Sequence, residues 1–450
     1  MNITRRDLLL AGGAGLAAAA GFAPRAGFTE MLGTSGPFAD YRALVCVFLF
    51  GGNDSFNMLV PRSPAEYGVY QAARQNLAIS QTALLPITPL TQDGAAYGIH
   101  PAMPGLRDLF ETERAAFVTN VGPLFAPTTK EQYLAKSVPL PPQLFSHNDQ
   151  QDQWHSLKGG SANRSGWAGR IADMLRANVT NQQLATNISL RGTNLFQAGD
   201  STISYIMGAR GPTPFLSFQP GGPYEAKLRS AFERLIDARY ESMYERAFAE
   251  VQRRALRGTD RLTEALAAVS IATPFPPSEL GQQLRTVARM LAVRDRFEMK
   301  RQIFFVASPG FDSHDEQVVV QPALLGNVSA CLKAFYAATV ELNVASSVTT
   351  FTQSDFGRTL TSNGDGSDHA WGGNQIVMGG AVRGRMLYGT YPRLELDGPD
   401  DVGGGRLIPT TSADQYAATL SRWFGIADAD LDRVAPHLAS FPQRDLGFMV

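Results

Sequence analysis

The chain has little cysteine and almost no net charge. It contains only Cys46 and Cys331 among 450 residues, and its 40 Lys and Arg residues face 41 Asp and Glu residues, which leaves a formal charge of −1. Both cysteines lie within apolar patterns, so we expect two buried thiols and no disulfide framework. A chain so close to neutral has no basic field for nucleic acid or an anionic membrane, and we expect no nucleic-acid partner.

Familiar hydrolase signatures are missing as well. The sequence holds neither a Cys-x-Pro-x-Arg segment, as sulfatases have, nor a Gly-x-Ser-x-Gly nucleophile elbow. It also shows no internal repeat and no low-complexity tract. These absences argue against an ordinary sulfatase or esterase.

The N-terminus has the features of an export signal. Thr4-Arg5-Arg6 precedes an apolar run, Ala11 to Ala23, that is rich in Ala, Gly and Leu. A stable membrane span needs about 20 mostly apolar residues, so this pattern predicts a cleaved twin-arginine signal peptide over residues 1–25. An uncleaved anchor is the alternative. We therefore expect contact with the twin-arginine translocase, a periplasmic, secreted or cell-surface location, and no stable membrane span, because no later apolar stretch approaches that length.

Residues 40–450 read as an α/β domain. Continuous apolar runs of strand length recur, and such runs are typical of parallel strands covered by helices on both faces. A helix-period segment of crossover length separates two of them, which predicts βαβ units in a mixed or parallel sheet. The predicted strands are 43–50, 115–122, 302–307, 347–352 and 375–378, and the crossover helix is 322–342.

The pattern changes to long amphipathic helices between about 222 and 300. Apolar residues at helical spacing, such as Leu228, Phe232 and Ile236, predict a helical insertion between the early and late strands. We expect these apolar stripes to be core packing. A loop over 398–405 and a final helix over 413–424 complete the chain.

Acidic and imidazole side chains follow several predicted strands. In an open α/β sheet the loops at the carboxyl ends of parallel strands meet at one edge, where ligands bind. Carboxylates with one or two imidazoles suit a divalent cation. Taken singly, an aspartate at a strand end is more often a loop cap or Asx-turn, but their recurrence favours a metal site made by Asp54, Asp312, His314, Asp355 and His369.

Four ordered segments carry a family resemblance. They are Gly51-Gly-Asn-Asp54-Ser-Phe-Asn57, Gly310-Phe-Asp-Ser-His314, Ser354-Asp-Phe-Gly-Arg358 and Ser367-Asp-His-Ala-Trp-Gly-Gly373. They resemble the exported family catalogued as domain of unknown function 1501, which is similar to sulfatases and to the alkaline phosphatase superfamily. The resemblance covers nearly the whole mature chain. It implies a three-layer α/β/α sandwich with a mostly parallel sheet, of the alkaline phosphatase type.

The resemblance also implies roles for the strand-end residues. Asp54, Asp312, His314, Asp355 and His369 match metal ligands of the wider superfamily. Phe356 stands where that superfamily usually has a further histidine, so a single cation is as consistent with the sequence as a pair. The cation can be Zn²⁺, Ca²⁺, Mg²⁺ or Mn²⁺.

Ser146 and Arg358 are the candidate catalytic residues. Ser146 lies in a segment similar to the family's nucleophile region, although Asn148 replaces an aromatic residue there. It is equally suited to cap the helix that begins near Asn148. The guanidinium of Arg358 could hold a phosphate or sulfate oxygen, or form a structural ion pair. His100, His155 and His437 have no ligand spacing, and we expect them to be structural.

Together these features predict an exported metal-dependent hydrolase. Its expected substrate is a small molecule or a glycan that carries a phosphate or sulfate ester. The alternative is a metal-stabilised protein of the same fold that binds glycans or a partner protein without catalysis.

Overall fold

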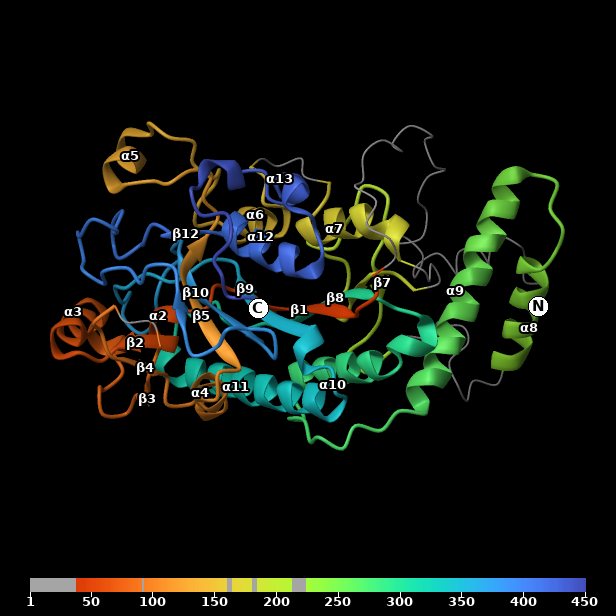
Figure 1. Ribbon diagram of the computed structural model, residues 1–450, viewed down its shortest axis with the longest axis horizontal. Coiled ribbons are helices and arrows are strands. Elements are labelled where there is room, and N and C mark those ends of the chain that lie inside the picture. The colour runs from red at the N-terminus through yellow and green to blue at the C-terminus, as the bar shows by residue number, and fades with distance from the viewer. Residues whose placement is uncertain (1–37, 91–92, 160–163, 180–183, 213–223) are drawn as a thin grey trace.

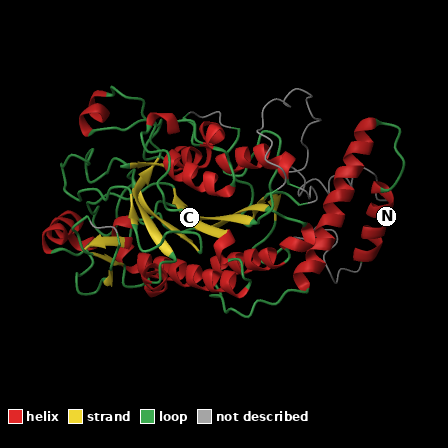
Figure 2. Cartoon of the chain, viewed as in Figure 1, coloured by secondary structure: helices red, strands yellow, loops and turns green. Residues whose placement is uncertain are grey.

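The computed structural model describes residues 38–90, 93–159, 164–179, 184–212 and 224–450 (Figure 1). The predicted signal peptide lies outside these residues. Within them the chain is a mixed α/β structure with a mostly parallel central sheet (Figure 2).

The central sheet has nine strands in the order β11-β5-β10-β9-β1-β8-β6-β7, with β12 also paired to β5. Every pairing is parallel except those of β10, which runs antiparallel to both β5 and β9. The bounds are β1 Arg42–Leu49, β5 Ala115–Gly122, β6 Asn187–Ser189, β7 Tyr205–Ile206, β8 Arg301–Ser308, β9 Val348–Ser354, β10 Gly373–Gly379, β11 Leu387–Tyr388 and β12 Thr411–Ser412.

Both faces of this sheet are covered by helices, as continuous apolar strands require. In β1 alternate side chains enter two different cores, Val45 and Val47 on one face and Leu44 and Cys46 on the other. The first face packs against α4 (Pro104–Glu111), α10 (Glu279–Ala292) and α11 (Gln317–Glu341). The second packs against α6 (His147–Ser156), α7 (Trp167–Leu175), α12 (Ala413–Phe424) and α13 (Leu431–Val434) (Figure 1).

A smaller three-stranded sheet flanks the N-terminal part of the domain. It contains β2 (Leu59–Pro61), β4 (Tyr97–Ile99) and β3 (Leu85–Ile87), all antiparallel. The short helix α2 (Ser55–Met58) and α3 (Pro64–Arg74) accompany it, and α5 (Lys130–Ala135) follows later.

The predicted helical segment begins as a hairpin that projects from one end of the molecule (Figure 1). Helices α8 (Glu225–Ile236) and α9 (Met243–Ala267) share a small apolar cluster that includes Phe232 and Leu256. The last turns of α9 and the whole of α10 join the main core. The later part of this segment therefore belongs to the helical layer that covers one face of the sheet.

Helix α11 corrects one expectation. By length and composition it is long and apolar enough to cross a membrane, whereas the sequence analysis expects no such stretch beyond the leader. Its buried residues, among them Leu325, Val328 and Phe335, pack in the core beneath the sheet. That packing is the environment of a core helix.

The register of the sheet aligns the ends of three strands. Leu49 of β1 pairs with Ser308 of β8 on one side and with Ser354 of β9 on the other. The loops that follow these strands consequently leave the sheet at one edge, where the sequence places Asp54, Asp312 and Asp355.

Candidate metal centre

The turn after β1 lets the loops at this edge approach closely. Gly51 has a φ of +114°, and a Cβ there would lie 2.3 Å from the backbone nitrogen of Asp312. Only glycine fits such a turn. The Gly51 N–H also donates to Oδ1 of Asp355 at 3.2 Å, so this turn links the loops after β8 and β9.

Three side chains from different elements converge at this edge. His147 opens α6, Asp312 follows β8, and His369 lies in the loop before β10. One ligand atom from each lies within 4.8 Å of the other two, an arrangement that could hold a metal ion. The Nε2 atoms of His147 and His369 lie 3.5 and 3.4 Å from the Asp312 carboxylate.

His314 joins this group from the side of His369. Its Nε2 lies 3.1 Å from Asp312 Oδ1 and 2.8 Å from Nε2 of His369. We call His147, Asp312, His314 and His369 the imidazole cluster.

All three imidazoles are oriented by an acceptor at Nδ1. His147 Nδ1 donates to Asp355 Oδ2 at 2.6 Å, and His369 Nδ1 donates to the Phe145 carbonyl at 2.7 Å. His314 Nδ1 lies 3.2 Å from Asp368 Oδ1. An acceptor at Nδ1 leaves the lone pair on Nε2, and metal-binding histidines commonly show this pattern.

If both rings are neutral, the two closest nitrogens cannot bond each other directly. With protons on both Nδ1 atoms, Nε2 of His314 and Nε2 of His369 are both acceptors at 2.8 Å. A cation between the two rings, or a second proton on one of them, removes this conflict. Ligands about 2.0–2.1 Å from one cation are separated by roughly 3 Å, so the spacing and the donor set fit a metal ion.

Charge and burial shift the ring pKa values in opposite directions. The hydrogen bond to Asp355 raises the pKa of His147. Burial lowers the pKa of His369, and the neighbouring cationic groups add to that effect. A histidine kept neutral is a better ligand, because binding requires the free lone pair.

Asp355 lies beside the cluster as a support for His147. It is fully buried, and its Oδ2 accepts hydrogen bonds from His147 and, at 2.7 Å, from Gln151 Nε2. Both of its oxygens are thus occupied by protein donors.

Asp54 is not brought into the cluster. It is buried, and its Oδ2 pairs with Arg74 and accepts from Gln317. Its Oδ1 has no hydrogen-bond partner among the described residues. Asp54 therefore forms a buried ion pair with Arg74. The residues next to Asp54 in the sequence do not predict this pair.

Arg358 is fully buried and ends on the cluster aspartate. Its Nη2 donates to Asp312 Oδ1 at 2.6 Å, while Nε and Nη1 have no partner in the described part of the chain. Partial burial of Asp312 acts to raise the pKa of its carboxyl group, but the Arg358 guanidinium holds that pKa below its usual value. The arginine therefore orients Asp312 and is shielded from an external anion.

Phe356 packs against the cluster. Its ring lies 4.8 Å from that of His147 and 4.5 Å from that of His369. An apolar ring thus lies against two of the imidazoles and offers no ligand atom. The ligands that remain suit one cation better than two.

Ser146 is the N-cap residue of α6, one position before His147. Its hydroxyl donates to Asp149 Oδ2 at 2.6 Å and makes no capping bond to the backbone. Among the described residues, no hydrogen bond joins the Ser146 hydroxyl to the cluster, so its predicted catalytic role stays a prediction.

The sequence pattern alone does not predict a role for His147. A signal was available, because His147 and Gln151 are four residues apart on one face of α6 and both reach Asp355. The remaining histidines, His100, His155 and His437, lie outside the cluster.

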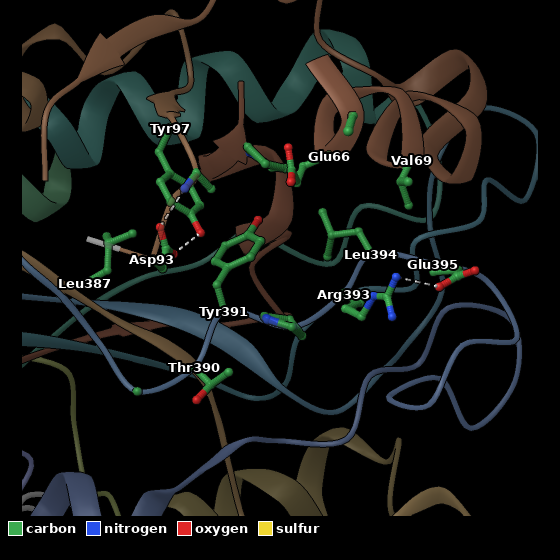
Figure 3. A pocket seen from close by; sticks show the side chains of 15 residues that line it. Glu66, Val69, Asp93, Tyr97, Leu387, Thr390, Tyr391, Arg393, Leu394 and Glu395 are labelled. Atoms are coloured by element: carbon green, nitrogen blue, oxygen red, sulfur yellow. Dashed lines mark hydrogen bonds and ion pairs between the residues drawn. The ribbon is translucent and has the colours of Figure 1, made fainter. Parts of the chain in front are cut away.

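Two cavities occur elsewhere on the molecule. One of about 530 Å³ lies between α3, β4 and the segment after β11 (Figure 3). Its polar groups pair with one another: Tyr97 donates to Asp93 at 2.6 Å, and Arg393 lies 3.7 Å from Glu395. The other, of about 580 Å³, borders α10. Neither contains a cluster residue.

Comparison with known proteins gives a family match and distant structural matches. Residues 41–435 match the family described as Protein of unknown function (DUF1501). No curated protein matches. Among solved structures, the crystal structure of Ps i-CgsB in complex with k-i-k-neocarrahexaose aligns over 87% of this chain and 74% of that chain, with 12% identity and a TM-score of 0.30. A score that low supports no conclusion about fold or function.

Proposed function

This chain belongs to the DUF1501 family, and from that premise and the geometry of the imidazole cluster we propose that it is an exported metal-dependent hydrolase with a fold of the alkaline phosphatase and sulfatase type. The observation that carries the proposal is the orientation of His147, His314 and His369, whose Nε2 atoms all face Asp312 while acceptors occupy Nδ1.

The donor set favours a cation of borderline character. Three imidazoles with one carboxylate suit Zn²⁺ or Mn²⁺, whereas Ca²⁺ and Mg²⁺ prefer oxygen ligands. When bound, such an ion polarises an ester oxygen and makes a nearby water or hydroxyl easier to deprotonate.

The chain's own residues prepare this site. Asp355 holds His147 in one tautomer, and Arg358 orients Asp312. Phe356 excludes water from the side of the two rings that it covers. Asp312 is half exposed at the cluster, so a substrate can approach from solvent.

We propose phosphate or sulfate esters as the substrate class, acted on in the periplasm or at the cell surface. The location depends on the predicted twin-arginine leader. Export that persists in a strain without that translocase would contradict it, as would export after Arg5 and Arg6 are both changed to Lys.

The activity is tested with aryl phosphate, phosphodiester and aryl sulfate substrates on zinc- or manganese-loaded protein. We expect turnover of at least one class, its loss in Asp312→Asn, and its persistence within a few-fold in Ser146→Ala, because Ser146 is engaged by Asp149. Loss of turnover in Ser146→Ala with unchanged metal content would instead identify its hydroxyl as the nucleophile.

If the metal-loaded parent hydrolyses none of these substrates, the alternative of a metal-stabilised glycan- or protein-binding role is favoured.

A further inference from the structure

The cavity beside α10 differs from the imidazole cluster in its charge. Three arginines line it, Arg210 from the loop before α8 and Arg285 and Arg289 from one face of α10. No aspartate or glutamate lines it. Its volume of about 580 Å³ is in the range of small-molecule sites.

These arginines lack compensating charge. In the part of the chain that the structure describes, no carboxylate lies within ion-pair distance of any of the three, whereas Arg191 and Arg296 nearby pair with Glu279 and Glu264. Burial, and then the charge of Arg285, lowers the pKa of Arg289. Like charges held together at a cavity are stabilised by an anion.

Hydrogen bonds hold the wall in place. Arg210 Nε donates to Gln282 Oε1 at 3.0 Å, and Thr286 Oγ1 donates to the Ala209 carbonyl at 2.7 Å. Arg289 donates to the Leu266 carbonyl at the end of α9. Arg285 is exposed and makes no such contact with the residues that the structure describes, which leaves its N–H groups available to a ligand.

Apolar residues complete the cavity. Val269, Phe275 and Pro276 line it together with the hydroxyl-bearing Ser270. This composition suits an anionic group attached to an organic body, since guanidinium groups bind phosphate and sulfate oxygens through paired N–H donors.

We propose that this cavity is a binding site for the phosphate or sulfate group of a small organic ester. It shares no residue with the imidazole cluster, and it does not depend on the function proposed for that cluster.

Calorimetric titration of the purified chain at low ionic strength tests the proposal. The probes are inorganic sulfate, inorganic phosphate, glucose 6-sulfate, glucose 6-phosphate and uncharged glucose. We expect an ester to bind more tightly than the free ion of the same kind, and glucose not to bind. Arg285→Gln should weaken ester binding about tenfold, as expected for loss of a charge-assisted hydrogen bond.

Two controls assign the signal to this cavity. Arg234→Gln removes an exposed arginine of α8 that does not line the cavity, and should leave the affinity unchanged. The pair His147→Ala with His369→Ala disables the cluster and should also leave it unchanged. Arg285→Glu should abolish binding.

The proposal is overturned if no anion binds the parent, or if Arg285→Gln and Arg234→Gln have equal effects. Loss of binding only in the cluster variant would overturn it too, and would show that the anion binds at the cluster. Binding of the free ions alone would contradict the part of the proposal that requires an organic body.

Discussion

At the scale of single residues, Asp355 controls the imidazole cluster from outside it. Its Oδ2 accepts from His147 Nδ1, and its Oδ1 accepts from the Gly51 N–H. The carboxylate therefore fixes both the tautomer and the position of one ring. It is a positioning residue, and removal of its charge should act through His147.

Replacing Asp355 with Asn keeps the size of the side chain and one acceptor oxygen but removes the charge. Because the hydrogen bond to Asp355 raises the pKa of His147, that pKa should fall in the metal-free variant. Metal affinity should fall by about 10- to 100-fold, as for other supports of metal-binding histidines. NMR titration of the ring and competition with a chelator give the two readouts.

Gln151→Met is the matched control for this substitution, because it removes the other donor to Asp355 and leaves the carboxylate charge. Gln151→Met should lower the His147 pKa and the metal affinity less than Asp355→Asn does. An unchanged His147 pKa in Asp355→Asn would show that the carboxylate does not act on the ring.

Only part of this site can be predicted from the sequence. Strand ends identified Asp312, His314 and His369, and the structure brings these three together. The pair between Asp54 and Arg74 depends on how α3 packs, which no local spacing encodes. The sequence pattern identifies Arg358 as a candidate site residue, but it does not predict that this side chain is buried beneath Asp312.

At the scale of elements, α6 links the cluster to the core. Its first residue, His147, faces the cluster, while His155 in its last turn lies among Phe48, Phe196 and Phe305. His155 Nε2 has no hydrogen-bond partner in the described residues, and burial lowers its pKa to about 4. This ring stays neutral in the folded protein at pH values where it would be protonated in the unfolded chain.

The free energy of unfolding should therefore depend on pH in a defined window. For a histidine whose folded pKa is lowered, stability is fully present above the unfolded value near 6.5 and is lost as the pH falls toward the folded value of about 4. Burial also lowers the pKa of His100 to about 4, so this histidine changes the stability in the same direction. Each can contribute a loss of up to roughly 3 kcal/mol.

Urea denaturation at several pH values across this window checks the expectation. The variant His155→Phe cannot be protonated and should show a shallower fall than the parent, with His100 still contributing. Parallel curves for the two proteins would mean that His155 does not titrate on unfolding.

The turn after β1 gives a second prediction for an element. Gly51→Ala places a Cβ against the Asp312 backbone at a positive φ, so it should cost more than about 1 kcal/mol and loosen metal binding. Gly68→Ala lies in α3 with nothing within 4 Å, and should stabilise by about 0.5–1 kcal/mol. Equal effects in thermal unfolding would rule out the close approach of the two loops.

Long apolar runs made most of the central elements predictable. The runs at 43–50, 115–122 and 302–307 became β1, β5 and β8. Helix α12 has the bounds predicted for the last helix, although the short helix α13 follows it. The antiparallel direction of β10 is set by its partners across the sheet, so its own residues do not show it. Short strands such as β7 and β12 have too few residues for a pattern.

At the scale of the whole molecule, the two cores on either side of the sheet hold the strand ends in register, and the imidazole cluster forms where the loops after β8 and β9 meet the start of α6. Residues as far apart in sequence as His147 and His369 therefore act as one group. The proposed hydrolase function depends on that group binding a divalent cation.

A metal-free structure could satisfy the same contacts in one other way. A doubly protonated His314 would donate from Nδ1 to Asp368 and from Nε2 to His369. The cluster would then be a network of hydrogen bonds with no ion, and its charge would come from the proton.

The most direct test is the metal content of the purified chain, measured by mass spectrometry after dialysis against zinc, manganese, calcium and magnesium together. We expect one tightly held zinc or manganese ion per chain. The ion should be lost in the double variant His147→Ala with His369→Ala and kept in His437→Gln, which changes a histidine outside the cluster. A parent that holds no ion, or a double variant that holds as much as the parent, would contradict this expectation.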